Sequence, residues 1–447
     1  MDLPPKPASR PDDAGWLTRI RLFRQDMFRS QPARLYRAWM AEMPTPFYRS
    51  YLVNDPDLVR EVLDAPEATF PKHPAVGRTL RALLGRSVFV SGGQDWARAR
   101  RIIDPAFEGG RLRAAFDPVC AAGEAAVADL LAGPLEAEAF CSRLAADAMF
   151  RLLFSTPISD GVAAETYEAF RAYQRAQPLL RPLDLVRAPD WIPRLPRRED
   201  ADAARIRALL TRLVNARIAV VEAGTAPDDL ATRLLTKADP ETGRRFDREE
   251  MVDQVSIFFL AGHETSAAAL SWALYLLATH PEAQERARVE AQTFAREPAF
   301  AALKSLPFLR DVFRETLRLY PPVPMLVREN RVARIWRGRR IARGAMVILS
   351  PWHLHRHSRI WAEPDRFDPD RWSAEPPRQA YFPFSQGHRV CPGAGLAMME
   401  GVLFLAQILA QFELKARDVP VPTAHLTVRS ESGINLTLIP RQTVPDL

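Results

Sequence analysis

One stretch of the chain is apolar on almost every face of a helix. It reads VSIFFLAGHETSAAALSWALYLL and covers residues 255–277. A helix with apolar side chains all round is stable only where it is buried on all sides. We therefore predict a long central helix here, with much of the chain packed around it.

The middle of this predicted helix carries polar residues in an unusual place. Gly262, Glu264, Thr265 and Ser266 interrupt the apolar pattern. Such a patch can simply be a polar contact between helices, and the short motif alone favours that interpretation. Alternatively, the helix opens locally at Gly262, and the Thr265 hydroxyl forms a hydrogen bond to a small ligand held there.

The rest of the pattern is mainly helical. Helical periodicity runs through residues 110–293 and is interrupted at 181–200 by a proline-rich stretch that predicts a loop. Asp55-Pro56 predicts a helix that begins there and continues through Leu63, because proline suits the first helical turn. Residues 15–43 are amphipathic and favour one or two helices.

Strand signals are few and lie towards the two ends. They predict a strand at 47–54, hairpins within 331–350, and a hairpin at 426–441 that turns at Ser432-Gly433. No internal repeat or linker divides the chain. We expect residues 1–447 to form one large, mainly α domain with small β-sheets, in which residues 1–20 are a loosely ordered N-terminal arm.

Charge and cysteine content narrow the function. The chain has a net charge of +7, but no compact basic run with interleaved aromatic residues, so a nucleic-acid partner is not expected. Residues 1–15 are polar, and neither a signal peptide nor a membrane span is expected. The chain has three irregularly spaced cysteines, Cys120, Cys141 and Cys391, which favours a reducing, cytoplasmic location.

Cys391 lies in an unusual setting, the segment FSQGHRVCPGAG at 384–395. It has three possible roles: a small buried apolar residue, a thiol nucleophile or a metal ligand. No CxxC or histidine cluster accompanies it, which argues against zinc. A single thiolate is sufficient for haem iron, because the porphyrin supplies four further donors.

The residues around Cys391 favour this last role. Phe384, Gly387, Arg389, Cys391 and Gly393 follow one another in an order and spacing that resembles the haem-binding loop of the cytochrome P450 family. The glycines would let the backbone approach a flat macrocycle and direct amide N–H groups at the sulfur. A helix predicted to begin just after the cysteine would stabilise the thiolate. The family often has glycine where this chain has Ser385.

The central helix resembles the oxygen-binding helix of the same family. The resemblance implies that haem b lies between this helix and the cysteine loop, with Cys391 as the iron ligand and Ala261 beside the haem. It also implies that Glu264 and Thr265 act as an acid–alcohol pair that delivers protons during oxygen activation.

Other motifs extend the resemblance. It implies that Trp96, Arg100, Arg328 and Arg389 bind the haem propionates, whose burial requires positive charge nearby. Glu315 and Arg318 in RETLRLYPPVP, together with Arg371 in FDPDRW, resemble the family's buried Glu–Arg–Arg network. The three histidines of WHLHRH, residues 352–357, lack partner ligands at suitable spacing, so we expect a structural role for them.

The resemblance implies a soluble, bacterial-type monooxygenase that inserts one oxygen atom of O₂ into a hydrophobic organic substrate. The electrons would come from NAD(P)H through separate redox proteins. A haem-thiolate peroxygenase or rearrangement enzyme and a non-catalytic haem sensor are the alternatives. The substrate pocket would be lined by 74–90, 176–195, Phe258, Ala261, 323–327 and 430–434.

The basic charge suggests how an electron donor is recruited to a monomeric enzyme. Arg98 and Arg101 share a helix face that differs from that of Trp96 and Arg100. If Arg100 binds a propionate, we expect Arg98 and Arg101 to remain unengaged and to attract an acidic ferredoxin or flavodoxin-like donor, itself supplied by its reductase. The alternative is that these arginines only keep the protein soluble.

Overall fold

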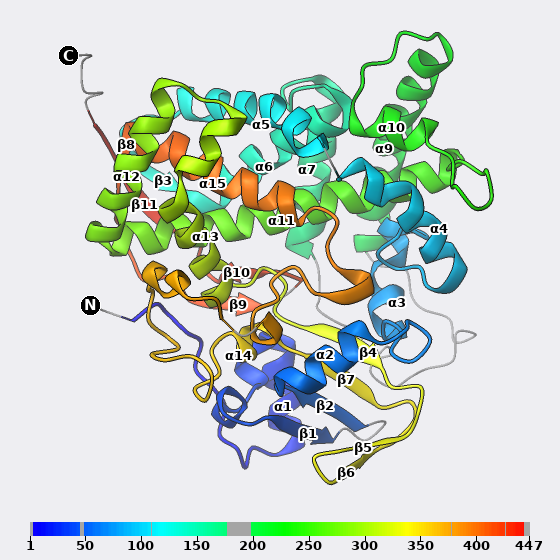
Figure 1. Ribbon diagram of the computed structural model, residues 1–447, viewed down its shortest axis with the longest axis vertical. Coiled ribbons are helices and arrows are strands. Elements are labelled where there is room, and N and C mark those ends of the chain that lie inside the picture. The colour runs from blue at the N-terminus through cyan, green and yellow to red at the C-terminus, as the bar shows by residue number, and fades with distance from the viewer. Residues whose placement is uncertain are drawn as a thin grey trace.

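The computed structural model describes residues 3–44, 49–108, 110–176, 198–376, 378–424 and 426–441. Helices form the broad part of the molecule, the sheet of β1, β2, β7 and β4 and the β5–β6 hairpin lie at the opposite end, and the sheet of β3, β11 and β8 lies beside α12 and α15 (Figure 1). This arrangement is the predicted one, mainly α with small β-sheets.

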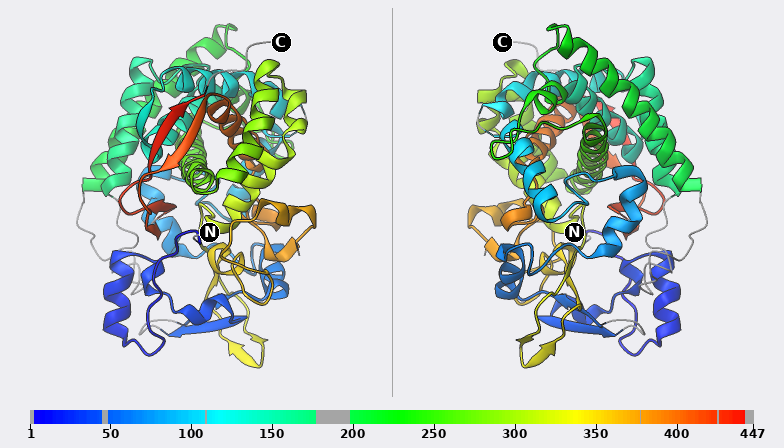
Figure 2. Two further views of the ribbon diagram at one scale, coloured as in Figure 1. Left: turned by 90° about the vertical axis from the view of Figure 1, so that its left-hand side faces the viewer. Right: turned by 90° about the vertical axis from the view of Figure 1, so that its right-hand side faces the viewer.

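The predicted central helix is α11 (Arg248–Thr279), 32 residues long. It begins with a capping box, in which Asp247 and Glu250 accept hydrogen bonds from each other's backbone N–H. It packs along α6 (Ala137–Phe154) and also contacts α13 (Pro307–Leu319) and α15 (Ala394–Gln411). Figure 2 shows α11 running through the interior of the helical part, which explains its apolar sequence.

The remaining helices surround this centre, and the predicted helix at Asp55-Pro56 is confirmed as α2, with Asp55 as its N-cap. Their bounds are α1 (Trp16–Gln25), α2 (Pro56–Asp64), α3 (Pro74–Leu84), α4 (Gly93–Ile103), α5 (Arg111–Ala128), α7 (Gly161–Ala176), α9 (Arg198–Glu222), α10 (Leu230–Thr236), α12 (Pro281–Arg296) and α14 (Pro351–Leu354).

Four small sheets are formed by the described residues. The largest has the order β1-β2-β7-β4, with β1 (Met40–Pro44), β2 (Arg49–Val53), β4 (Leu326–Glu329) and β7 (Met346–Leu349). A hairpin of β5 (Arg334–Trp336) and β6 (Arg339–Ile341) confirms one of the hairpins predicted within 331–350. The other two sheets pair β9 (Pro422–Ala424) with β10 (Val428–Ser430), and β3 (Gly133–Glu136) and β8 (Phe412–Ala416) with β11 (Asn435–Pro440).

Two secondary-structure predictions were wrong. Residues 40–44 form strand β1 and not the end of a helix, because pairing with β2 outweighs their helical pattern. The turn at Ser432-Gly433 exists, and the Ser430 hydroxyl donates to the Gly433 carbonyl oxygen at 2.7 Å. However, β10 and β11 do not pair with each other, since β9 satisfies β10 while β3 and β8 flank β11.

The segment predicted to be a loose N-terminal arm makes specific contacts at Pro5 and Lys6. The Pro5 carbonyl oxygen accepts a hydrogen bond from the Tyr320 hydroxyl at 2.8 Å, and Lys6 pairs with Asp365. Most of the proline-rich stretch at 181–200 lies outside the described residues. In the described part of the chain, one helix, α15, is long and apolar enough to cross a membrane, but 61% of it is buried inside the molecule.

Candidate functional site

The cysteine loop is held in place by backbone contacts. The Cys391 amide donates to the Phe384 carbonyl oxygen at 2.9 Å, which closes the loop. Gly387 has a φ of +66°, and a Cβ there would overlap the carbonyl oxygen of Leu63 at the end of α2. Gly387 is therefore required for packing against α2, a reason that differs from the predicted approach to a macrocycle.

Cys391 itself combines solvent exposure with close protein surroundings. Solvent reaches its side chain, yet enough protein surrounds the sulfur that burial raises the pKa of the thiol. A hydrogen bond from the Gly393 amide and the charge of Arg100 both lower this pKa again. The predicted helix is confirmed as α15, which begins at Ala394, so its N-terminus lies next to the thiol.

A narrow accessible stripe runs along the middle of α11. Ala261 is exposed and Thr265 half-buried, whereas most of this helix is buried. The Thr265 hydroxyl donates to the Ala261 carbonyl oxygen at 2.6 Å. One interpretation of the sequence was that the helix opens at Gly262, but the helix does not open there. It is continuous, and Gly262 allows close packing, because a Cβ there would overlap the Met149 side chain of α6.

The four predicted propionate ligands have different surroundings. The Arg389 guanidinium stacks 4.5 Å above the Trp96 ring, pairs with Glu67 and donates to the Ser91 carbonyl oxygen. Arg100 instead donates to the Val390 carbonyl oxygen at 2.9 Å and to Asp104 at 3.0 Å, so it braces the cysteine loop.

Arg328 belongs to a buried basic cluster that includes a residue the sequence analysis missed, Lys72. The Lys72 and Arg328 backbones form a β-bridge. Burial, and then the charge of Arg389, lower the pKa of Arg328 to about 10. Burial is also the largest cause that lowers the pKa of Lys72, and the charges of Arg389 and Arg328 lower it further. No described carboxylate pairs with Lys72 or Arg328, so the cluster carries excess positive charge.

Comparison with known proteins identifies the family. The family model for cytochrome P450 matches residues 24–438. This chain belongs to the cytochrome P450 family. It is 34% identical over 386 residues to cyclooctat-9-en-7-ol 5-monooxygenase of Streptomyces melanosporofaciens, covering 84% of this chain and 81% of that one.

Two further relatives agree. Cyclooctatin synthase of the same organism is 31% identical over 412 residues, or 89% of this chain and 86% of the synthase. The crystal structure of the cytochrome P450DA haem domain superposes with a TM-score of 0.80 and 26% identity, over 99% of this chain and 98% of that one. The protein is a cytochrome P450 monooxygenase, and the family uses haem and O₂.

The residues present in this P450 fit a haem group. Arg328 is only 6% exposed and lacks a described acidic partner, and the buried Nε of Arg389 has no hydrogen-bond partner. A buried cation without an anion is costly, and a group with two carboxylates would offset that cost. The accessible thiol of Cys391 and the stripe at Ala261 and Thr265 provide the remaining surfaces that a flat ligand requires.

Glu264, the predicted acid of this P450, is held by residues from other elements. Its carboxylate accepts hydrogen bonds from Thr427 at 2.9 Å and from Gln174 at 3.2 Å. Arg429 on β10 lies 3.3 Å away and forms an ion pair with it. Glu264 is thus buried in a polar cluster that joins α7, α11 and the C-terminal segment.

The predicted Glu–Arg–Arg network is assembled in the structure. Arg318 binds Glu315 through two hydrogen bonds of 2.8 Å, and Arg371 lies 3.4 Å from the same carboxylate. Arg318 also donates to the carbonyl oxygens of His355, Pro364 and Arg366. The network therefore ties α13 to the segment that leads to the cysteine loop.

The histidines of WHLHRH have structural contacts, as expected. His353, His355 and His357 are all buried, and burial lowers the pKa of each. His355 accepts a hydrogen bond from the Phe382 amide at 3.0 Å. Within the described part of the chain, no group of three or more metal-ligating side chains is found. Cys120 and Cys141 are both buried.

The expectation that Arg98 and Arg101 are unengaged was wrong. Arg98 pairs with Glu250 at the start of α11. Arg101 forms two hydrogen bonds with Asp239, at 2.6 and 3.0 Å, and an ion pair with Glu241. Both arginines tie α4 to the α10–α11 region, because acidic residues far away in sequence lie opposite them in the fold.

Proposed function

We propose that Cys391 is the protein ligand of haem b in this monooxygenase, and that residues 1–447 form one P450 domain around it. The observation that carries this proposal is the accessible Cys391 thiol, which receives a hydrogen bond from the Gly393 amide at the N-terminus of α15. Both features stabilise a thiolate. A thiolate ligand in turn favours O–O bond cleavage when haem is bound.

The side chains around the thiol would have separate tasks. Arg328, Arg389, Lys72 and Trp96 would hold the propionate carboxylates, while Arg100 keeps the cysteine loop in position. Phe384 and Gly393 shape that loop, and Ala261 leaves room on the opposite side. The Thr265 hydroxyl can both accept and donate a proton, which suits it for proton delivery at the oxygen-binding face.

Glu264 would supply protons to Thr265 from the buried polar cluster. In the structure its carboxylate is bound to Thr427, Gln174 and Arg429. Arg429 is partly exposed, with 26% of its side chain accessible, so it connects this cluster to solvent. Release of one of these contacts would allow Glu264 to exchange a proton with solvent on one side and with Thr265 on the other.

The substrate would be a hydrophobic organic molecule such as a terpenoid, a fatty acyl chain or an aromatic. Phe258 and Ala261 on α11, together with residues 74–90, 323–327 and 430–434, would line the pocket. Of the remaining predicted segment, 177–195 lies outside the described residues. One relative is named for oxidation of cyclooctat-9-en-7-ol, which supports a terpenoid-like substrate.

Electrons would come from NAD(P)H through a separate acidic ferredoxin or flavodoxin-like protein and its reductase. We place the enzyme in the cytoplasm as a monomer. A peroxygenase would work with hydrogen peroxide alone, and a sensor would show no substrate-dependent NAD(P)H consumption. A substrate library assayed with redox proteins and O₂ distinguishes the three functions.

The ligand assignment is tested by reducing the purified protein under carbon monoxide and recording its spectrum. The parent should show the absorption of a thiolate-ligated haem, and Cys391→Ala should lose it. Cys120→Ala is the matched control and should keep the parent spectrum. A histidine-type spectrum in the parent, or an unchanged spectrum in Cys391→Ala, would overturn the assignment.

A further inference from the structure

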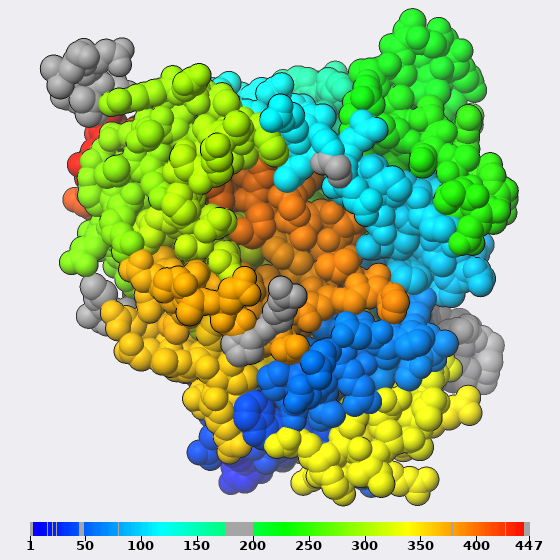
Figure 3. All heavy atoms as spheres, viewed as in Figure 1, coloured from blue at the N-terminus to red at the C-terminus, as the bar shows by residue number. Residues whose placement is uncertain are grey.

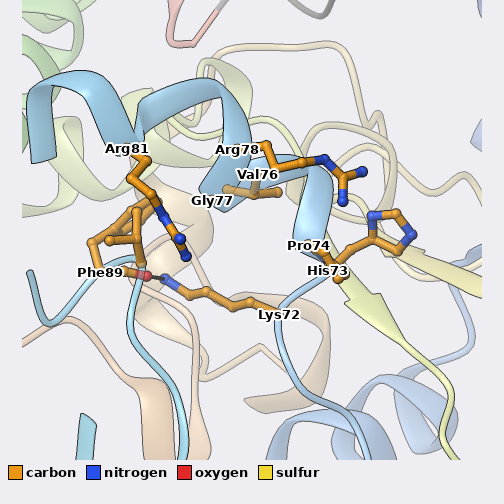
Figure 4. Close-up of a pocket in the computed structure, with 9 residues that line it drawn as sticks. Lys72, His73, Pro74, Val76, Gly77, Arg78, Arg81 and Phe89 are labelled. Carbon is orange, nitrogen blue, oxygen red and sulfur yellow. Dashed lines mark hydrogen bonds between the residues drawn. The ribbon is translucent and has the colours of Figure 1, made fainter. Parts of the chain in front are cut away.

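Two buried histidines accept a hydrogen bond from a backbone N–H through a ring nitrogen. The His73 ring accepts from the Ala75 amide at 3.3 Å and so caps α3, in the wall of the cavity shown in Figure 4. The His355 ring accepts from the Phe382 amide at 3.0 Å, 27 residues further along the chain. His73 therefore stabilises the start of its own helix, whereas His355 connects two separate segments.

The His355 end of this connection is fixed by α13. The His355 carbonyl oxygen accepts a hydrogen bond of 2.9 Å from Arg318, the arginine that binds Glu315. The His355 ring is fully buried, and the backbone of Leu317 and Arg318 faces it. The Glu–Arg–Arg network therefore holds His355 in one place.

The Phe382 end leads into the cysteine loop. The Phe382 carbonyl oxygen accepts from the Ser385 amide at 3.0 Å. The Phe384 carbonyl oxygen then accepts from the Cys391 amide at 2.9 Å. Phe382 is 1% exposed, and its ring meets the His355 ring edge to face, with 5.4 Å between the ring centres. A series of hydrogen bonds thus links the His355 ring to the cysteine loop.

Only the neutral form of the ring can accept this hydrogen bond. An imidazole that accepts at Nε2 carries its proton at Nδ1, and a protonated ring has no acceptor left. Burial, and then the charge of Arg318, lower the pKa of His355 to about 3, and Arg356 lowers it further. Tyr381, whose ring centre lies 5.2 Å away, stays neutral because burial raises its pKa. The groups around the ring therefore favour the form that binds Phe382.

We propose that His355 is a positioning residue for the cysteine ligand, because its ring nitrogen fixes Phe382 at the start of the loop that holds Cys391. This inference rests on the proposed function, in which Cys391 binds the haem iron. His355 would act through the loop backbone and not by contact with the iron. Without its ring nitrogen the buried Phe382 N–H has no acceptor, and an unpaired buried amide favours a displaced loop in which it reaches water.

The test compares two substitutions at His355 in the haem-loaded protein. His355→Gln keeps an acceptor that can reach the position of Nε2, whereas His355→Phe keeps a ring and removes the acceptor. Each variant is reduced under carbon monoxide, and the fraction of the complex without thiolate-type absorption is measured together with the reduction potential. His355→Phe should raise that fraction about tenfold and shift the potential, whereas His355→Gln should restore the parent values.

His353→Phe is the matched control. His353 is also fully buried, two residues earlier in the chain, but its ring contacts the Ser350 hydroxyl at 2.8 Å. Loss of that contact should lower the unfolding midpoint without changing the carbon monoxide spectrum or the reduction potential. The control separates a merely structural role from one that reaches the iron ligand.

Acid provides a second readout. When the loop is displaced, the His355 ring is solvated and its pKa returns towards about 6.5. Protonation then favours the displaced loop, so the connection through His355 is complete above about pH 6.5 and weakens as the pH falls below that value. Between about pH 6.5 and pH 5 the parent should lose the thiolate-type spectrum more steeply than His355→Gln, because glutamine does not titrate.

Three outcomes would overturn the inference: His355→Phe keeps the parent spectrum and potential, His353→Phe changes them to the same extent, or the parent and His355→Gln respond equally to acid. If His355→Phe does not fold, the acid comparison decides alone. Each of these outcomes is compatible with a parent whose thiolate-type spectrum is lost in Cys391→Ala, in which case the proposed function stands. A parent without that spectrum would instead contradict the proposed function.

Discussion

The Ser266 hydroxyl donates a hydrogen bond of 2.7 Å to Oε2 of Glu400 and so joins α11 to α15. Glu400 is 2% exposed, and its other oxygen has no hydrogen-bond partner. Burial raises the pKa of this carboxyl to about 7, and the Ser266 hydrogen bond lowers it only in part. The contact between the two helices therefore contains a carboxyl group that ionises near neutral pH.

This contact predicts a pH-dependent stability. The carboxyl binds its proton more tightly when folded than when unfolded, so its contribution is complete below about pH 4.5 and is lost as the pH rises through about 7. The loss is on the order of 3 kcal/mol, since one pKa unit corresponds to about 1.4 kcal/mol. Glu400→Gln keeps the hydrogen bond from Ser266 but cannot ionise, and it should gain stability relative to the parent between pH 5 and pH 8.

Unfolding midpoints of the two proteins, measured across that pH range, check the prediction. Glu168→Gln on α7 removes an exposed carboxyl and should show no comparable pH-dependent gain. A constant difference between Glu400→Gln and the parent at every pH would mean that Glu400 does not ionise in this range.

Backbone strain in the cysteine loop leads to a second prediction. Ser385 has a φ of +63°, a left-handed conformation that is unfavourable for residues with a Cβ. Glycine removes a strain of about 1–2 kcal/mol but adds about 0.5–1 kcal/mol of unfolded-state entropy. Ser385→Gly should therefore raise the unfolding free energy by about 0.5–1 kcal/mol and leave the carbon monoxide spectrum unchanged. Ser385→Ala retains the Cβ and should bring no gain, so equal stability of the two variants would refute the strain argument.

Thr265 should control the coupling of electron use to product formation. Its hydroxyl lies on the accessible stripe of α11 and donates to the Ala261 carbonyl oxygen. Without it, oxygen activation loses a general acid of the kind that contributes about 10²–10⁴-fold in rate. Thr265→Ala should keep haem and substrate affinity but divert most NAD(P)H to hydrogen peroxide, while Thr265→Ser should restore product.

The control for this prediction lies on the same helix. Ser271 donates to the Ala267 carbonyl oxygen at 2.7 Å in the same i to i−4 geometry, but it is fully buried. Ser271→Ala should not change the ratio of product to NAD(P)H consumed. Full coupling in Thr265→Ala would place the proton route elsewhere.

The sequence predicted those parts of the site whose residues are close together in the chain. The spacing from Phe384 to Gly393 indicated the cysteine loop, and the apolar run at 255–277 indicated α11. Both depend on local patterns, in which each residue's neighbours carry the signal.

Most of the failures involve residues that are distant in sequence. Lys72 gave no signal, because its role depends on the β-bridge to Arg328. Arg98 and Arg101 looked unengaged, because Glu250 and Asp239 lie more than a hundred residues further along the chain. Strand β1 is a different case: β2 begins only five residues after β1 ends, and the pairing of the two strands outweighs the helical pattern of β1.

These ion pairs change the prediction for the electron donor. Charge reversal at Arg98 or Arg101 would place two acids side by side and destabilise the packing of α4, whatever the donor does. A better candidate surface lies where the cysteine loop and the start of α15 reach the molecular surface beside α5 (Figure 3). Gly395 of α15 faces Leu112 of α5, because a Cβ placed on Gly395 would lie 3.7 Å from the Leu112 side chain.

Arg111 and Arg113 flank Leu112 and are both exposed. Arg111 is 3.9 Å from the exposed Asp228, a distance that gives only a weak pair, and Arg113 lies over the Phe300 ring at 5.5 Å. The double variant Arg111→Glu/Arg113→Glu should therefore fold normally but slow the second-order reduction by an acidic donor about tenfold at low ionic strength, with a flatter salt dependence. Arg340→Glu/Arg343→Glu makes the same charge change near the β5–β6 hairpin and should reduce normally. Equal reduction rates and equal salt slopes in the two double variants would show that electrons do not enter through this face. Loss of carbon monoxide binding would instead show that the substitutions disturb the haem site itself.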